Sequence, residues 1–82
     1  MDNLDSKIIE AINTLSPTSF VSAIDVNDKV KMVKEDLGDR LMVLKKSGHV
    51  DIITREFISS MTLPNFIVKV RIKEPGLNAL KK

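Results

Sequence analysis

The stretch "VKEDLGDRLMVLKKSGHVDII" (residues 33–53) decides the fold, because it holds the clearest helix of the chain and the start of a strand. Its apolar residues recur at the spacing that one stripe along a helix requires: Leu37, Leu41 and Leu44. Two lysines in the last turn suit the negative end of the helix dipole. Gly48 then provides a left-handed C-cap. The stretch therefore predicts a helix near 35–47 that is followed at once by a strand.

Two runs with strand character follow this helix. "HVDIITREFIS" is rich in β-branched residues and predicts a strand near 49–58. "FIVKVRIK" alternates apolar and polar residues and predicts a strand near 66–73. The alternation places three apolar side chains on the buried face: Val68, Val70 and Ile72. The two runs predict a hairpin, and "EPGLNALKK" predicts a short final helix after Pro75 and Gly76.

The chain before residue 33 predicts two more helices. An apolar stripe predicts a helix near 5–15, and "SPTS" ends it: Leu4, Ile8, Ile12 and Leu15. Ile9 lies beside the stripe, as part of a broad core face or as a dimer contact. Phe20 and Val21 form a short β-like pair, and Ser22 is the expected N-cap of a helix near 23–31.

A hairpin is not stable alone in water, so this one has to lay its apolar face on the helices. The expected structure is a single α+β domain over residues 1–82.

This order of elements resembles the winged-helix (winged helix-turn-helix) family along nearly the whole chain. Residues 22–30 look like the first helix of the helix-turn-helix, and "EDLGDRLMVLKKSGHV" (residues 35–50) is similar to the recognition helix and its entry into the wing. "VRIKEPGLNALKK" is similar to the closing strand and the short helix after it, with matching residues at Ile72, Gly76 and Leu80. The family usually has Gly and then Ser or Thr in the turn between the central helices. Lys31 and Val33 stand in those places, which fits a second helix that runs longer.

The resemblance implies an α+β winged helix, with a three-helix helix-turn-helix core, a C-terminal hairpin wing and a short final helix. It implies binding of duplex DNA through the third helix and the wing, and the leading hypothesis is a dimeric transcription regulator. The family also contains proteins that bind proteins, so the alternative is an adaptor, such as an accessory subunit of a replication or transcription complex. A structural homodimer is a third hypothesis. Fold alone does not choose between these functions.

The charge of the third helix is unusual for a DNA-binding helix. Glu35, Asp36 and Asp39 lie at its front, where phosphates would repel them. Carboxylates in a first turn also stabilise a helix, so the acids have a purely structural explanation. Arg40 is the candidate for a direct base contact, through guanine O6 and N7, and a salt bridge with Asp36 is the alternative.

The basic residues are concentrated toward the C-terminal half, which favours an anionic partner. Lys69, Arg71 and Lys73 are expected on one face of one strand, where such a row can follow a phosphate backbone or simply be solvated. Arg55 on the partner strand is expected to join them. The candidate nucleic-acid-binding residues are Lys31, Lys34, Arg40, Arg55, Lys69, Arg71 and Lys73. Lys81 and Lys82 fit a solubilising tail.

Apolar residues crowd the expected hairpin tip, and not all of them can point inward, because neighbouring side chains in a strand face opposite ways. They are Phe57, Ile58, Met61, Leu63, Phe66 and Ile67. A contiguous exposed patch favours a homodimer or a protein partner. The candidate protein-interaction residues are Met42, Val43, Ile53, Leu63 and Phe66.

Several classes of function find no support in the sequence. There is no Cys, His49 is the only His, and no Gly-rich phosphate loop is present, so neither an enzyme nor a metal or other cofactor is expected. No apolar run approaches membrane-spanning length, and the N-terminus does not resemble a signal peptide. A cytoplasmic location is the expectation.

Overall fold

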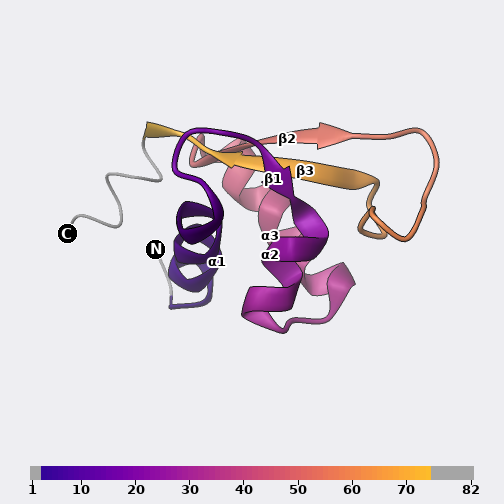
Figure 1. Ribbon diagram of the computed structural model, residues 1–82, viewed down its shortest axis with the longest axis horizontal. Coiled ribbons are helices and arrows are strands. Elements are labelled where there is room, and N and C mark those ends of the chain that lie inside the picture. The colour runs from indigo at the N-terminus through magenta and orange to yellow at the C-terminus, as the bar shows by residue number, and fades with distance from the viewer. Residues whose placement is uncertain (1–2, 75–82) are drawn as a thin grey trace.

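The computed structural model describes residues 3–74. Its elements are α1 (Asn3–Leu15), β1 (Val21–Ser22), α2 (Ala23–Val30), α3 (Lys34–Lys46), β2 (Val50–Thr54) and β3 (Ile67–Ile72). The three strands form one antiparallel sheet, and the helices lie together on one side of it (Figure 1). The predicted α+β class is confirmed. The predicted final helix, with Gly76 and Leu80, lies outside the described residues.

The last strand of the sequence, β3, is the central strand of the sheet. It pairs with β1 through Val21 opposite Val70, and with β2 through Val50 opposite Ile72. Its inward side chains meet the apolar faces of the helices in one core: Ile8, Ile9, Ala11, Ile12, Ala23, Val26, Leu37, Leu41, Leu44, Val50, Leu63, Ile67, Val70 and Ile72. Ile9 is fully buried, so it is part of the core face of α1 and not a dimer contact.

A β-bulge changes the predicted inner face of β3. Ile53 pairs with Lys69, but Thr54 pairs with Ile67, so Val68 is an extra residue in β3. As a consequence Ile67 enters the core, and Val68, although buried, is not part of it. Val68, Val70 and Ile72 are all buried as predicted, but the predicted set lacks Ile67, because strict alternation does not survive an inserted residue.

The third helix ends as its sequence predicts. Gly48 has a φ of 83°, and its N–H donates to the carbonyl of Lys45. The N–H of His49 donates to the carbonyl of Leu44, which completes the paired bonds of a Schellman cap. This cap turns the chain directly into β2 and fixes where the hairpin leaves α3.

The turn between α2 and α3 uses a residue that is unusual there. Lys31 has a φ of 57° and a ψ of 41°, a left-handed conformation that glycine adopts at lower cost. Val33 is the N-cap of α3, and it offers no side-chain hydrogen bond. The idea of a longer second helix is wrong, because α2 ends at Val30 and Lys31 takes the role of the missing glycine.

Replacing Lys31 with glycine is expected to raise the free energy of unfolding by about 1 kcal/mol, because a β-carbon in the left-handed region costs about 1–2 kcal/mol and the added chain entropy of glycine offsets only part of this. Urea denaturation of both proteins measures the change. Lys29→Gly, inside α2, is the matched control and should lower stability by about 1 kcal/mol. An equal loss of stability at both positions would contradict the left-handed conformation of Lys31.

The two strands of the hairpin are shorter than predicted. The expected ranges 49–58 and 66–73 shrink to Val50–Thr54 and Ile67–Ile72, and residues 55–66 form a loop. The strands end early because the residues that would pair with residues 55–58 form a separate tight turn. In that turn the N–H of Phe66 donates to the carbonyl of Leu63, and the N–H of Leu63 donates to the carbonyl of Ile67.

Two contacts fasten this loop to the body of the protein. Leu63 is fully buried in the core. Asn65 lies so close to Gly38 of α3 that an added β-carbon on Gly38 would be 2.5 Å from Asn65 Oδ1. Both amide atoms of Asn65 are buried without a hydrogen-bond partner. The loop is thus placed by packing on one side of α3 rather than by strand pairing.

Candidate functional site

The loop of residues 55–66 has internal hydrogen bonds that give it a defined shape. At its base the N–H of Arg55 donates to the carbonyl of Phe66 over 2.9 Å. Near its tip Ser59 and Thr62 bond reciprocally, since the N–H of Ser59 donates to Thr62 Oγ1 and the N–H of Thr62 donates to the carbonyl of Ser59. The Oγ1 of Thr62 also donates to that carbonyl. Side chains on this loop therefore stand on an ordered backbone.

Phe66 is held in an unfavourable backbone conformation. The turn that precedes it has Pro64 and Asn65 at its centre, and the hydrogen bonds match a type I turn followed by a left-handed residue. Glycine is the usual residue in that last place. Phe66 has a φ of 69° there, and its side chain is 42% exposed. The chain thus carries a large aromatic residue where the backbone favours the smallest one.

Phe66→Gly is expected to be more stable than Phe66→Ala by about 1 kcal/mol, although both variants lose the ring, because only alanine keeps a β-carbon at positive φ. Thermal or urea denaturation of the two variants measures the difference. Ile53→Gly and Ile53→Ala form the control pair inside β2, where alanine should be the more stable. The same order at both positions would contradict the strained conformation.

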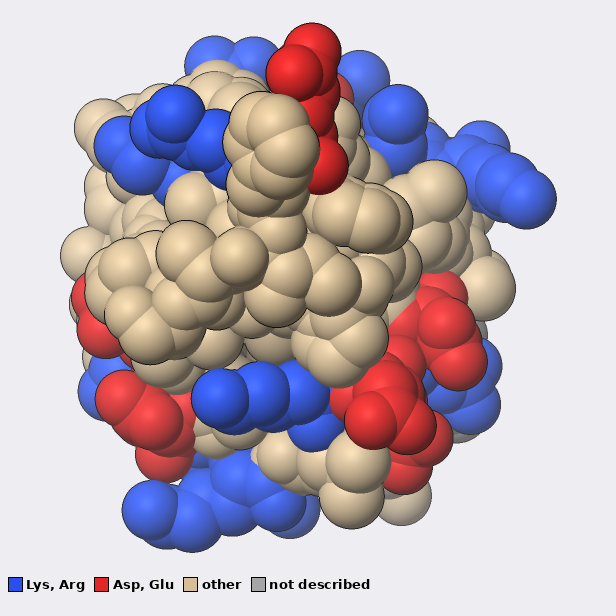
Figure 2. Space-filling model, turned by 90° about the vertical axis from the view of Figure 1, so that its right-hand side faces the viewer, with Lys and Arg blue, Asp and Glu red and all other residues tan. Residues whose placement is uncertain are grey.

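Four large apolar side chains on this loop are exposed and form the apolar loop surface: Phe57 (80% exposed), Ile58 (58%), Met61 (49%) and Phe66 (42%). No charged residue occurs between Glu56 and Lys69. Figure 2 looks at this end of the molecule and shows a broad uncharged area, with acidic and basic side chains around its border. An uncharged area that carries four exposed apolar side chains is a candidate for a binding surface.

The predicted protein-interaction residues are only partly on this surface. The prediction is wrong for Leu63, because this residue is fully buried and anchors the loop instead of contacting solvent. Met42 is half-buried against the core, and Val43 in α3 and Ile53 in β2 are exposed but do not belong to the loop. Phe57, Ile58 and Met61, which the sequence places at the crowded hairpin tip but not among the candidate interaction residues, are more exposed than Phe66. The signal that could have found them is the uncharged run directly after Arg55 and Glu56.

A groove of about 460 Å³ lies between α1 and α3. Its lining is Leu4, Met32, Asp36, Asp39, Arg40 and Val43. Arg40, the candidate for a base contact, lies with its Nε 3.8 Å from Oδ1 of Asp5 in α1. The guanidinium is thus held against the body of the protein, while Asp36 and Asp39 are exposed. The groove combines apolar side chains with two exposed carboxylates.

The second arginine proposed for DNA, Arg71, also has a partner within the protein. Its Nη2 lies 3.8 Å from Oδ2 of Asp51 in the neighbouring strand, and its guanidinium carbon lies 4.8 Å from the centre of the Phe20 ring. These three residues lie on the face of the sheet that the helices do not cover. Part of the charge of the predicted basic row is therefore balanced locally.

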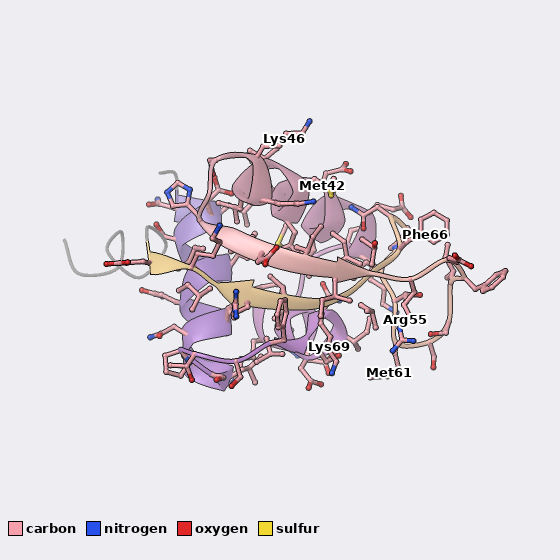
Figure 3. All side chains as sticks on the ribbon, turned by 90° about the horizontal axis from the view of Figure 1, so that it is seen from above. Met42, Lys46, Arg55, Met61, Phe66 and Lys69 are labelled. Carbon is pink, nitrogen blue, oxygen red and sulfur yellow. The ribbon has the colours of Figure 1, made fainter. Side chains whose placement is uncertain are left out.

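The remaining basic candidates do not form one surface. Lys69 is exposed on the open face of the sheet, Lys73 follows the end of β3, and Arg55 belongs to the loop and not to the strand (Figure 3). Lys31 and Lys34 are exposed at the turn between α2 and α3. Met42 and Lys46 project from the opposite side of the hairpin from Lys69 (Figure 3). The predicted row of three on one strand reduces to Lys69 and Arg71 within β3.

Among residues 3–74, no group of His, Cys, Asp or Glu could hold a metal ion, and no helix is long and apolar enough to cross a membrane. Comparisons with protein-family models, with curated proteins and with solved structures find no match for this chain.

Proposed function

We propose that this chain is an interaction domain that docks on another protein through the apolar loop surface. The observation that carries the proposal is the exposure of Phe57, Ile58, Met61 and Phe66 on one ordered loop. Fully burying a side chain of this size is favourable by about 1.5–3 kcal/mol. Aromatic side chains and methionine are also enriched at the centres of protein interfaces.

The order of the loop strengthens this proposal. Immobilising a rotamer-rich side chain or a mobile loop costs free energy on binding, and a loop that already has its bound shape avoids part of that cost. The reciprocal bonds of Ser59 and Thr62 and the buried side chain of Leu63 provide such order. The strained conformation of Phe66 is consistent with a functional position, because strained residues concentrate at binding sites.

For the fold we propose a winged helix, in which α2 and α3 are the helix-turn-helix and β2, β3 and their loop are the wing. The order of elements, the turn of residues 31–33 and the hairpin that follows α3 directly support it. In this proposal the wing carries apolar residues at the position where a DNA-binding wing meets a polyanion. The winged-helix adaptor is therefore the favoured form of the proposed function.

Binding of duplex DNA is the second candidate, and exposed basic residues at three places favour it. They are Lys31 and Lys34 at the helix turn, Lys69 on the sheet and Arg55 on the loop. Phosphate neutralisation is the main source of DNA affinity, and it falls steeply with salt. The first turn of α3, with Glu35 and Asp36 exposed, opposes this candidate.

Site-specific photo-crosslinking tests the docking proposal. A photoreactive amino acid placed at Phe57 or Met61 should give adducts of discrete mass in cells that produce the protein, and the same group at Thr18 should not. Thr18 is the control because it is exposed and lies outside the loop. The adducts from position 57 should decrease several-fold when Ile58 and Phe66 are replaced with serine. Equal labelling from all three positions would count against a docking site.

Fluorescence anisotropy with random duplex DNA at two salt concentrations tests the second candidate. DNA binding predicts an affinity that falls with salt and that drops further when Lys69, Arg71 and Lys73 are all replaced with alanine. No binding at low salt removes this candidate and leaves the docking proposal in place.

A further inference from the structure

A surface complementary to the apolar loop surface would be apolar at its centre and acidic at its border. Arg55 is exposed at the base of the loop, and Lys69 is exposed in the strand behind it. Glu56 is the one exposed carboxylate within the loop, so the loop and its base have a small positive excess. In Figure 3 Arg55, Met61 and Lys69 lie along the same edge of the hairpin.

The groove between α1 and α3 of the same protein has that complementary character. Leu4, Met32 and Val43 contribute apolar surface, and Val43 is 51% exposed. Asp36 and Asp39 stand at the groove with their side chains exposed, and Arg40 beside them is engaged by Asp5. The groove is thus apolar with an acidic excess, opposite in sign to the loop.

The loop cannot occupy the groove of its own copy. Asn65 packs against Gly38, which places the loop on one side of α3. Asp36 is two residues away from Gly38, and two residues are about 200° apart around a helix. Asp39, Arg40 and Val43 lie on the side of Asp36. The two surfaces therefore face different directions, and only a second copy can bring them together.

We propose that copies of this chain associate head to tail, with the apolar loop surface of one copy in the α1–α3 groove of the next and Arg55 against Asp36 and Asp39. The inference rests on the proposed docking role of the loop and names a second copy as its partner. In this head-to-tail arrangement each copy receives a loop from one neighbour and gives its own loop to another, so the contact is heterologous and association continues beyond a dimer. The groove volume of about 460 Å³ is large enough for bulky side chains of the loop.

A charge exchange tests this contact in the full chain. Arg55→Asp places a carboxylate against Asp36 and Asp39, and a second chain with Asp36→Lys and Asp39→Lys places lysines against Arg55. Each variant alone should associate about tenfold or more weakly than the wild type. In an equimolar mixture, the loop of the Arg55→Asp chain can bind the groove of the second chain, which carries the two lysines. The wild-type loop of the second chain can bind the wild-type groove of the first. The mixture should therefore recover the association of the wild type.

Sedimentation velocity over a wide range of protein concentration gives the readout. The wild type should show an average mass that rises with concentration past twice the monomer. Glu35→Lys is the matched control, since Glu35 is an exposed acid of α3 that does not line the groove, and it should associate like the wild type. Circular dichroism of each variant confirms that it is folded.

Several outcomes would overturn the inference: a wild type that stays monomeric, a mass that stops at the dimer, a mixture that does not recover, or association that requires added DNA. The proposed docking function is tested separately from the self-association. A monomeric wild type whose position 57 still crosslinks to a different protein contradicts only the self-association. Absence of specific crosslinks from position 57, together with a monomer, contradicts both.

Discussion

Gly38→Ala is expected to destabilise the protein by about 2 kcal/mol, although alanine in place of glycine normally stabilises a helix interior by about 1 kcal/mol. The new β-carbon would lie 2.5 Å from Oδ1, and 2.7 Å from both Cγ and Nδ2, of Asn65. Real β-carbons do not approach other atoms so closely, so the buried amide has to move. Because this amide is buried, its displacement is expected to disturb the packing of the loop on α3.

A double-mutant cycle gives this prediction its control. In an Asn65→Ala background the obstacle is absent, so Gly38→Ala should then stabilise the protein by about 1 kcal/mol. Asn65→Ala alone should cost little, because the buried amide atoms of Asn65 have no hydrogen-bond partner to lose. Urea denaturation of the four proteins measures the coupling. The same effect of Gly38→Ala in both backgrounds would refute the contact.

Leu63→Ala is expected to destabilise the protein by about 3 kcal/mol, through lost burial and the cavity left in the core. Leu63 is fully buried among residues of the helices and of β3, although it belongs to the loop. Its loss should also loosen the apolar loop surface, since the loop has no strand pairing of its own. Hydrogen exchange of the amides of Ser59 and Thr62, which are bonded within the loop, should become faster.

The control for this prediction lies five residues earlier. Ile58 is in the same loop but 58% exposed, so Ile58→Ala should change stability by no more than about 0.5 kcal/mol. Urea denaturation compares the two variants. Similar costs at both positions would mean that the loop is not anchored in the way its burial indicates.

Features that depend on local sequence were predictable, and features that depend on an inserted residue or on distant packing were not. The leucine stripe and Gly48 predicted α3 and its cap because both act within a few residues along the helix. The inner face of β3 was predicted without Ile67, because alternation carries no sign of the bulge at Val68. Arg55 was predicted in a strand, but β2 ends at Thr54, because the chain opposite it is used in the tight turn between Leu63 and Ile67.

The candidate site also has features that local sequence predicts and features that depend on distant packing. An exposed apolar tip was predictable, because too many apolar residues occur there for all to be buried. Arg40 was assigned to the outward face from its helical position alone. Its proximity to Asp5, 35 positions earlier in the chain, arises from the packing of α1 on α3 and leaves no trace in either local sequence. The same holds for the proximity of Arg71 to Phe20.

The central position of β3 has a consequence for the order in which this protein folds. Both other strands are edge strands, and each pairs only with β3, through Val21 opposite Val70 and Val50 opposite Ile72. During synthesis the helices can form early, but neither β1 nor β2 has a partner until the ribosome has released the residues of β3. Closing the long loop between Val21 and Val70 is slow in comparison with forming a helix. The sheet is therefore expected to form in a single late step. Until then, the apolar side chains with which the three helices pack on the sheet are exposed to solvent.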